Sequence, residues 1–250
     1  MTDRYADRPA DARRVAAPAI VGAGVILVVH AVMRAAGLFG PPDQRPLILG
    51  SFLLLWVTPF LFLTREDRQA IGLFRPVGPR WWARAFVYGV IISLIVFASA
   101  FALYGTGAGH PFASVRDSFL SGVIPPLSPF GQFLLFTGPA LIFSPIGEEF
   151  FCRGVIARLG ENLAGPLAGV AASAVVFASL HIMHHGLLRS AGGWSFMVAP
   201  GALWFAQTFA ISVLFSMIRR ASGSIWTAVA AHSGFNLAMN AIIFSMFVQE

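Results

Sequence analysis

The sequence contains no lysine and only 11 acidic residues among its 250 residues. Charged residues make up 11% of the chain, against about 25% in an ordinary soluble domain. Hydrophobic residues make up 57%, and the mean hydropathy is +0.75. So few charges cannot cover a water-exposed surface, which argues against a soluble globular protein. The composition predicts an integral membrane protein that crosses the bilayer several times.

Cysteine is almost absent as well. Cys152 is the single cysteine, so the chain can form neither an intrachain disulfide nor a cysteine-based metal motif. Its position between Glu149 and Arg153 raises the idea of a nucleophile. An unpaired cysteine in an apolar helix is more often buried and inert, and we assign Cys152 no role.

The net charge of +6 comes from arginine alone. The arginines lie in short stretches between apolar runs and form no clustered basic face, which argues against a nucleic-acid partner. The stretch 65–84 holds five of them, whereas the stretch 105–129 holds only Arg116. By the positive-inside rule, 65–84 and the N-terminus are expected in the cytoplasm and 105–129 outside. Arginine without lysine, with abundant Ala, Gly and Val, suggests a bacterial cytoplasmic membrane protein.

Apolar runs long enough for transmembrane helices recur along the chain. They cover 15–32, 47–63, 85–104, 130–158, 167–181, 198–218 and 225–248. This pattern predicts an all-α fold, a polytopic transmembrane helical bundle of about seven spans (six to eight), in one domain over 15–250. Residues 1–14 alternate acids and arginines with Ala and Pro, which predicts a disordered tail. The segment 70–74 is expected to lie on the membrane surface, beside the interfacial anchors Trp81 and Trp82.

Two adjacent acids, Glu148 and Glu149, lie inside an apolar run and are followed by Arg153. A carboxylate at membrane depth is costly, so it indicates a functional site. Successive helical residues point in different directions, whereas residues four apart share a face. We therefore expect Glu149 to pair with Arg153, and Glu148, without a local partner, to project into a cavity as a general base. A purely structural Glu–Arg cluster is the alternative.

Polar residues at helical spacing occur in two later runs. Phe177 and His181 lie one turn apart, so the phenyl ring can orient an imidazole that shares or relays a proton with the glutamate. His232 and Asn236 are four apart, which places two donors side by side. Such donors can stabilise an oxyanion during hydrolysis of an acyl bond. Hydrogen bonding between helices is an equally good interpretation of this second pair.

Four further polar residues are expected to have minor roles. His184 and His185 follow the apolar run 167–181, and we expect them to be solvated loop residues. His30 and Arg34 lie one turn apart in the first apolar run. We expect this pair to bind a loop acid or a lipid phosphate.

The polar residues form three motifs in sequence order. The strings EEFFCR at 148–153, FASLH at 177–181 and HSGFN at 232–236 read as EExxxR, FxxxH and HxxxN. Together with GSIWT at 223–227, they resemble the CPBP family of CAAX prenyl endoproteases and bacteriocin-processing membrane proteases. The resemblance covers about 131–240, the motif core, and the first three spans match only as generic hydrophobic helices. Each motif alone is weak, but three in order, each inside an apolar helix, are specific.

The resemblance implies an intramembrane endopeptidase that hydrolyses a peptide bond with glutamate-activated water. The residues it implies as catalytic are Glu148, His181, His232 and Asn236, with support from Glu149, Arg153 and Phe177. The expected partners are the lipid bilayer and a peptide or membrane-anchored protein substrate. Two other functions fit the same residues. Buried Glu and His also occur in proton-coupled transporters, although no internal repeat is evident. A non-enzymatic immunity or scaffold protein would use these residues only to bind a partner helix.

A metal is the remaining question about the site. Two histidines and a glutamate are a common set of ligands for catalytic zinc. The chain has no HExxH motif, and an amide beside His232 suits an oxyanion better than Zn²⁺. We therefore expect a site without metal or other cofactor.

Overall fold

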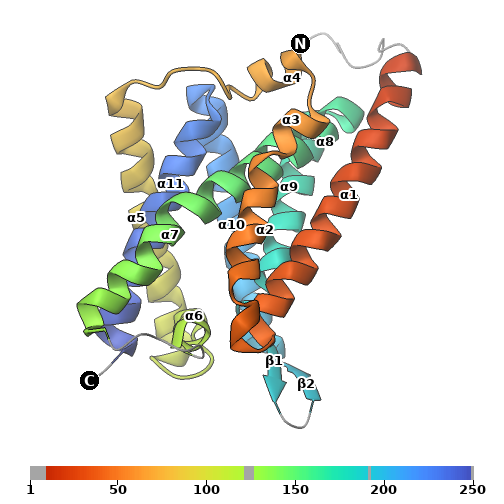
Figure 1. Cartoon of the computed structure of the whole chain (residues 1–250). Helices are drawn as coiled ribbons and strands as arrows, with labels where there is room; N and C mark the ends of the chain where they lie inside the picture. The colour runs from red at the N-terminus through yellow and green to blue at the C-terminus, as the bar shows by residue number, and fades with distance from the viewer. Residues whose placement is uncertain (1–9, 121–126, 191–192, 249–250) are drawn as a thin grey trace.

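The computed structural model describes residues 10–120, 127–190 and 193–248, and these are almost entirely helical (Figure 1). The helices are α1 (Ala10–Phe39), α2 (Pro46–Trp56), α3 (Thr58–Phe62), α4 (Arg65–Ala70), α5 (Pro79–Tyr104), α6 (Pro111–Leu120), α7 (Pro129–Glu148), α8 (Ala157–Ala164), α9 (Pro166–His181), α10 (Val198–Ser222) and α11 (Ile225–Ile242). Short 3-10 and π-helical segments are η1 (Pro42–Gln44), η2 (Glu149–Ile156) and η3 (Ile243–Phe247). One antiparallel hairpin pairs β1 (Leu187–Ser190) with β2 (Gly193–Phe196).

The prediction of an all-α transmembrane bundle is confirmed, and the count of about seven spans stays a prediction. Within the described residues, five segments are long and apolar enough to cross a bilayer. They are Ala17–Phe39, Pro42–Phe62, Pro79–Tyr104, Pro129–Ala164 and Val198–Ser222. The remaining two predicted spans are helical, but α9 has only 16 residues and α11 is not among the five.

The two ends of the bundle carry different elements (Figure 1). One end holds α3, α4 and the start of α1, and the opposite end holds α6 and the β-hairpin. The Arg-rich stretch 65–84 therefore lies opposite 105–120, as the sequence predicted. Residues 1–9 of the predicted tail lie outside the described residues, while residues 10–14 already belong to α1.

Helix α11 packs closely against α5 because both helices carry glycine at the crossing. A Cβ at Gly89 of α5 would collide with the backbone oxygen of Ala231, and one at Gly234 of α11 would collide with that of Phe86. Backbones can approach this closely only where side chains are missing, as is common between membrane helices. The close contact fixes the height of His232 and Asn236 within the bundle.

A proline in α7 leaves a backbone carbonyl available to accept a hydrogen bond from α11. Pro145 has no N–H, so the carbonyl of Leu141, four residues earlier, loses its usual helical donor. Ser233 of α11 supplies the missing donor, with its hydroxyl 2.8 Å from that carbonyl oxygen. Immediately after this turn the helix widens into the π-helical segment η2, a feature that is frequent at functional sites. The EExxxR motif occupies the junction of α7 and η2.

One local prediction differs from the structure, and one element was not predicted. The segment 70–74 does not lie wholly on the membrane surface, because Ile71 and Leu73 are buried in the core. The Ser224 hydroxyl and the Trp226 indole donate to the carbonyls of Gly72 and Leu73, which docks this segment on the start of α11. The β-hairpin was not predicted, since its eight residues carry no long alternating pattern.

Candidate active site

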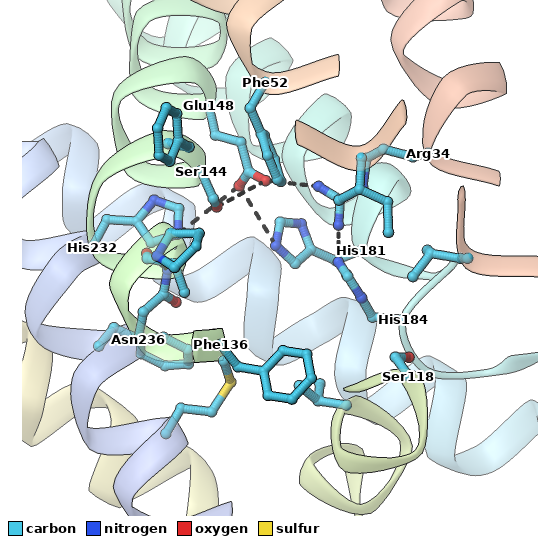
Figure 2. Close-up of a pocket in the computed structure, with 18 of the residues that line it drawn as sticks. Arg34, Phe52, Ser118, Phe136, Ser144, Glu148, His181, His184, His232 and Asn236 are labelled. Atoms are coloured by element: carbon cyan, nitrogen blue, oxygen red, sulfur yellow. Dashed lines mark hydrogen bonds and ion pairs between the residues drawn. The ribbon is translucent and has the colours of Figure 1, made fainter. Parts of the chain in front are cut away.

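Glu148 is the last residue of α7, and only 2% of its surface is exposed. Its Oε1 atom accepts from Arg34 Nη1 at 2.9 Å and from the Ser144 hydroxyl at 3.3 Å. Its Oε2 atom is buried and has no hydrogen-bond partner among the described residues. That oxygen lies 3.7 Å from His181 Nε2 and 3.9 Å from His232 Nε2 (Figure 2). One carboxylate oxygen is thus held in place, and the other faces two imidazoles across gaps too long for direct hydrogen bonds.

His181 is the last residue of α9, and a hydrogen bond and an aromatic contact hold its ring in place. Its Nδ1 atom is 2.8 Å from the backbone oxygen of Phe177, and a carbonyl can only accept, so Nδ1 carries the hydrogen. In the neutral ring the lone pair is then on Nε2, the atom that faces Glu148. The Phe177 ring lies 4.1 Å from the imidazole, centroid to centroid, and orients it as the sequence predicted.

Glu149 connects two other groups of the site. Its Oε2 atom is 3.1 Å from Arg153 Nε, so the ion pair predicted from the spacing is confirmed. Both side chains are completely buried. The Arg153 guanidinium also lies 4.1 Å from the centroid of Phe177 and 5.5 Å from that of Phe215, so two aromatic faces help to offset its charge. Glu148 and Glu149 point to different partners, as helical geometry requires.

His232 lies between the two glutamates. Its Nδ1 atom is 2.9 Å from Glu149 Oε1, and because a carboxylate accepts, Nδ1 carries a hydrogen. Its Nε2 atom faces Glu148 and can donate to a ligand only when the ring is protonated. Asn236 lies one turn further on, with its Nδ2 donating one hydrogen to the Ala140 carbonyl at 2.8 Å and keeping a second.

These groups line one end of a cavity of about 340 Å³. Its other walls are mostly apolar and come mainly from α2, α7, α10 and α11, with Phe52, Phe136, Phe143 and Met239 among them. Glu148, His181, His232 and Asn236 all border the cavity, and Figure 2 shows them around the same space. A buried carboxylate and two imidazoles at the end of an apolar cavity can hold one water against a bound acyl group.

Two residues of the site were misjudged from the sequence. Arg34 binds neither a loop acid nor a lipid phosphate, because it is buried and paired with Glu148. His184 is not a solvated loop residue, since it contacts the Arg34 guanidinium and lines the cavity. The only sign of this role in the sequence was an arginine inside an apolar run, and Glu148, with which Arg34 pairs, lies 114 residues later.

The two histidines next to these residues have structural contacts instead. His185, also expected in solvent, is fully buried and bonds to the Ser114 hydroxyl at 2.7 Å. His30 is buried, and its Nδ1 is 3.2 Å from the backbone oxygen of Ser51. The first contact attaches α6 to the turn after α9, and the second attaches α1 to α2.

Two features of the site count against a metal ion. In the part of the chain that the structure describes, no group of three or more His, Cys, Asp or Glu side chains could hold one. Arg34 already places a positive charge on Glu148, the one carboxylate between the two imidazoles. A second cation there would be repelled at close range.

The fold and site define a class of protein: a helical membrane protein with a carboxylate–imidazole centre inside the bundle. Residues 130–238 match the family model described as type II CAAX prenyl endopeptidase Rce1-like. The chain therefore carries an Rce1-like domain of the CAAX protease family, as the three motifs indicated, and this supports a CAAX protease-type enzyme. No curated protein and no solved structure matches the chain.

The matched segment begins near the start of α7 and ends in α11, so it includes all three motifs. Arg34 lies on α1, outside the match. The first helix thus supplies a charged partner to a site whose other polar groups come from the family domain.

Proposed function

We propose that this chain is an intramembrane endopeptidase in which Glu148 activates the attacking water. One observation carries the proposal: Glu148 Oε2 is buried, has no hydrogen-bond partner among the described residues, and faces two imidazole nitrogens at the end of an apolar cavity. A water between these atoms would have a base on one side and the substrate carbonyl on the other. General bases of this kind contribute about 10²- to 10⁴-fold to hydrolysis.

The reaction follows from the atoms that face this space. Water loses a proton to Glu148, assisted by the lone pair on His181 Nε2, and its oxygen attacks the carbonyl carbon of the peptide bond. The negative charge that develops on the carbonyl oxygen is stabilised by the protonated His232 through Nε2–H and by the second hydrogen on Asn236 Nδ2. The C–N bond then breaks, and the proton held by Glu148 passes to the leaving amine. A peptide or a membrane-anchored protein is the substrate.

The direct test is cleavage of a library of membrane peptides by purified wild type and by Glu148→Gln, followed by mass spectrometry. We expect defined cleavage sites for the wild type and none for the variant. The same preparations in liposomes report on transport. Flux that depends on a pH gradient, without any cleavage, would identify a proton-coupled transporter and reject the endopeptidase.

The oxyanion donors can be tested separately from the base. We expect Asn236→Ala to lower kcat about 10²- to 10³-fold with little change in KM, because its amide acts on charge that exists only in the transition state. Asn240→Ala is a matched control on the same helix, since the Asn240 amide donates to Thr137 at 3.2 Å and does not line the cavity. Equal losses in both variants would show that Asn236 acts only in helix packing.

Metal dependence gives a further test. We expect 1,10-phenanthroline or EDTA to leave the rate of peptide cleavage unchanged, because Arg34 already balances the charge on Glu148. The rate is measured on the purified protein before and after dialysis against chelator. Inactivation that Zn²⁺ reverses would contradict a glutamate mechanism without metal.

A further inference from the structure

The short helix α6 forms part of the wall of the catalytic cavity. Its Val115 and Ser118 side chains both line that cavity. Phe112, Ala113 and Val115 are buried, with at most 5% of their surface exposed. The helix lies near the β-hairpin, at the end of the bundle away from α4 (Figure 1). A helix of ten residues is too short to persist alone in water, so α6 depends on its contacts with the rest of the chain.

His110 caps the start of α6 with a ring nitrogen. Its Nδ1 atom accepts from the backbone N–H of Phe112 at 3.0 Å, a contact that a serine or asparagine oxygen usually makes at a helix N-cap. Its Nε2 atom is 3.4 Å from the backbone oxygen of Phe97 on α5, and a carbonyl can only accept, so Nε2 carries the hydrogen. A proton on Nδ1 would point at the N–H of Phe112. The cap therefore requires a neutral imidazole.

His185 connects α6 to two other segments. Its Nε2 atom is 3.1 Å from the backbone oxygen of Gly109, in the loop before α6, and so carries the hydrogen. Its Nδ1 atom bonds to the Ser114 hydroxyl of α6 at 2.7 Å and, in the neutral ring, accepts that hydrogen. The rings of His110 and His185 are both fully buried. Two neutral imidazoles thus attach α6 to α5 and to the turn after α9.

Burial favours the neutral form of both rings. It lowers the pKa of His110 to about 4, and it also holds the pKa of His185 below its usual value. In a released α6 both rings would return to an ordinary pKa of about 6.5. The released state then binds more protons than the docked state. The docked helix is therefore stable at neutral pH and loses stability as the pH falls below about 6.5.

No acid compensates a proton on either ring. Among the described residues, neither His110 nor His185 has a carboxylate partner. Asp117, the acid on α6, is exposed and pairs with Arg116 at 2.7 Å. The other ionisable groups on the segments around α6 are Asp43, Arg45, Tyr104, His184 and Arg189. A proton on His110 or His185 would therefore be a buried charge without a partner, which is costly.

We infer that His110 and His185 are positioning residues that hold α6 in place only while both rings are neutral, so that acidification releases the helix and removes its side chains from the catalytic cavity. The release of α6 does not depend on the reaction proposed for Glu148, whereas its effect on cleavage rests on that proposal. The ratio of released to docked α6 should rise up to about tenfold per pH unit for each histidine below about pH 6.5.

A thiol on the buried face of α6 measures this release directly. Ala113→Cys in a Cys152→Ala background gives the purified full chain one cysteine, at a position that is 2% exposed and does not line the cavity. The thiol is modified with 2,2′-dithiodipyridine, which reacts with thiols in acid, between about pH 7.5 and about pH 4.5. Asp43→Cys in the same background is exposed and gives the reference rate at each pH. We expect the normalised rate for Ala113→Cys to rise about tenfold or more per pH unit below about pH 6.5.

Variants without titrating rings provide the control. In His110→Asn with His185→Gln, the asparagine oxygen can still cap α6, and the glutamine amide can still bond to Ser114. We expect the rate for Ala113→Cys in this double variant to stay low at every pH. His30→Gln removes a fully buried histidine that contacts α2 instead of α6, and it should keep the rise in acid.

Two labelling results would overturn the inference. One is a rate that does not depend on pH when both histidines are native, a result that stands even if the double variant does not fold. The other is an equal rise in acid with and without His110 and His185, which would mean that other groups release the helix.

Peptide cleavage gives a separate readout of the same change. For each protein, the rate at about pH 5 is divided by the rate at about pH 7.5. We expect a higher ratio for His110→Asn with His185→Gln than for wild type, because the ionisable groups around Glu148 are the same in both proteins. Equal ratios would contradict a role of α6 in the catalytic cavity. If neither protein cleaves peptides, the proposed function fails, and the labelling still decides whether acid releases α6.

Discussion

Replacing Glu148 with glutamine should lower kcat for peptide cleavage by about 10²- to 10⁴-fold, the share that a general base contributes. Glutamine has nearly the same shape and can still accept from Arg34 and Ser144 through its amide oxygen. Its amide nitrogen, however, cannot take a proton from water. KM should change little, because Glu148 occupies only the end of an otherwise apolar cavity. Single-turnover cleavage by the purified variant measures the loss.

Folding must be measured beside this rate. Glu148→Gln leaves the buried Arg34 guanidinium without a counter-charge, and breaking a buried pair costs about 3 to 5 kcal/mol. Thermal unfolding in detergent shows whether the inactive variant is still folded. Glu161→Gln is the matched control, since Glu161 pairs with Arg219 far from the cavity and its loss should spare cleavage. A folded Glu148→Gln that cleaves near the wild-type rate would reject Glu148 as the base.

The parts of the site that could be predicted from the sequence depend on spacing within one helix. The pairing of Glu149 with Arg153 and the stacking of Phe177 on His181 both follow from a separation of four residues, which helical geometry turns into proximity. Composition likewise predicted the helical membrane bundle, because a chain with so little charge has few alternatives in lipid.

Contacts between distant segments could not be predicted in this way. His232 bonds to Glu149 across 83 residues, and which face of α11 meets η2 depends on the glycine crossing with α5 and on the Ser233 contact to α7. The number of spans stays a prediction for a related reason. Buried polar residues such as His232, Asn236 and Asn240 make α11 less apolar than a lipid-facing span, although it packs among other helices.

Arg34 is the residue whose role the structure changes most. It lies on α1, outside the motifs and the family match, and its guanidinium reaches both Glu148 Oε1 and His184. By fixing Oε1, Arg34 leaves Oε2 aimed between the two imidazoles. We regard it as a positioning residue, because it acts on the reaction only through Glu148. A planar guanidinium suits this task, since it can donate to two acceptors in fixed directions.

Arg34→Met should therefore lower kcat and also destabilise the fold by about 3 to 5 kcal/mol, because a buried carboxylate loses its partner. Arg34→Lys keeps the charge but cannot donate to both acceptors in the same geometry. Its stability should therefore lie close to that of the wild type, while its kcat stays reduced. Arg80→Met, at an exposed position at the start of α5, is the control for loss of an arginine and should match wild type. Unchanged kcat in a folded Arg34→Met would contradict the positioning role.

The double variant Arg34→Met with Glu148→Gln separates stability from catalysis. Removing both charges leaves no uncompensated ion in the bundle, so the double variant should unfold at a higher temperature than either single variant. Cleavage should nevertheless stay as low as in Glu148→Gln, because the base is still missing. Thermal unfolding and single-turnover cleavage of the four proteins complete the cycle. Additive losses of stability would instead mean that the Arg34–Glu148 contact contributes little to the folded state, and that Arg34 does not hold the carboxylate in place.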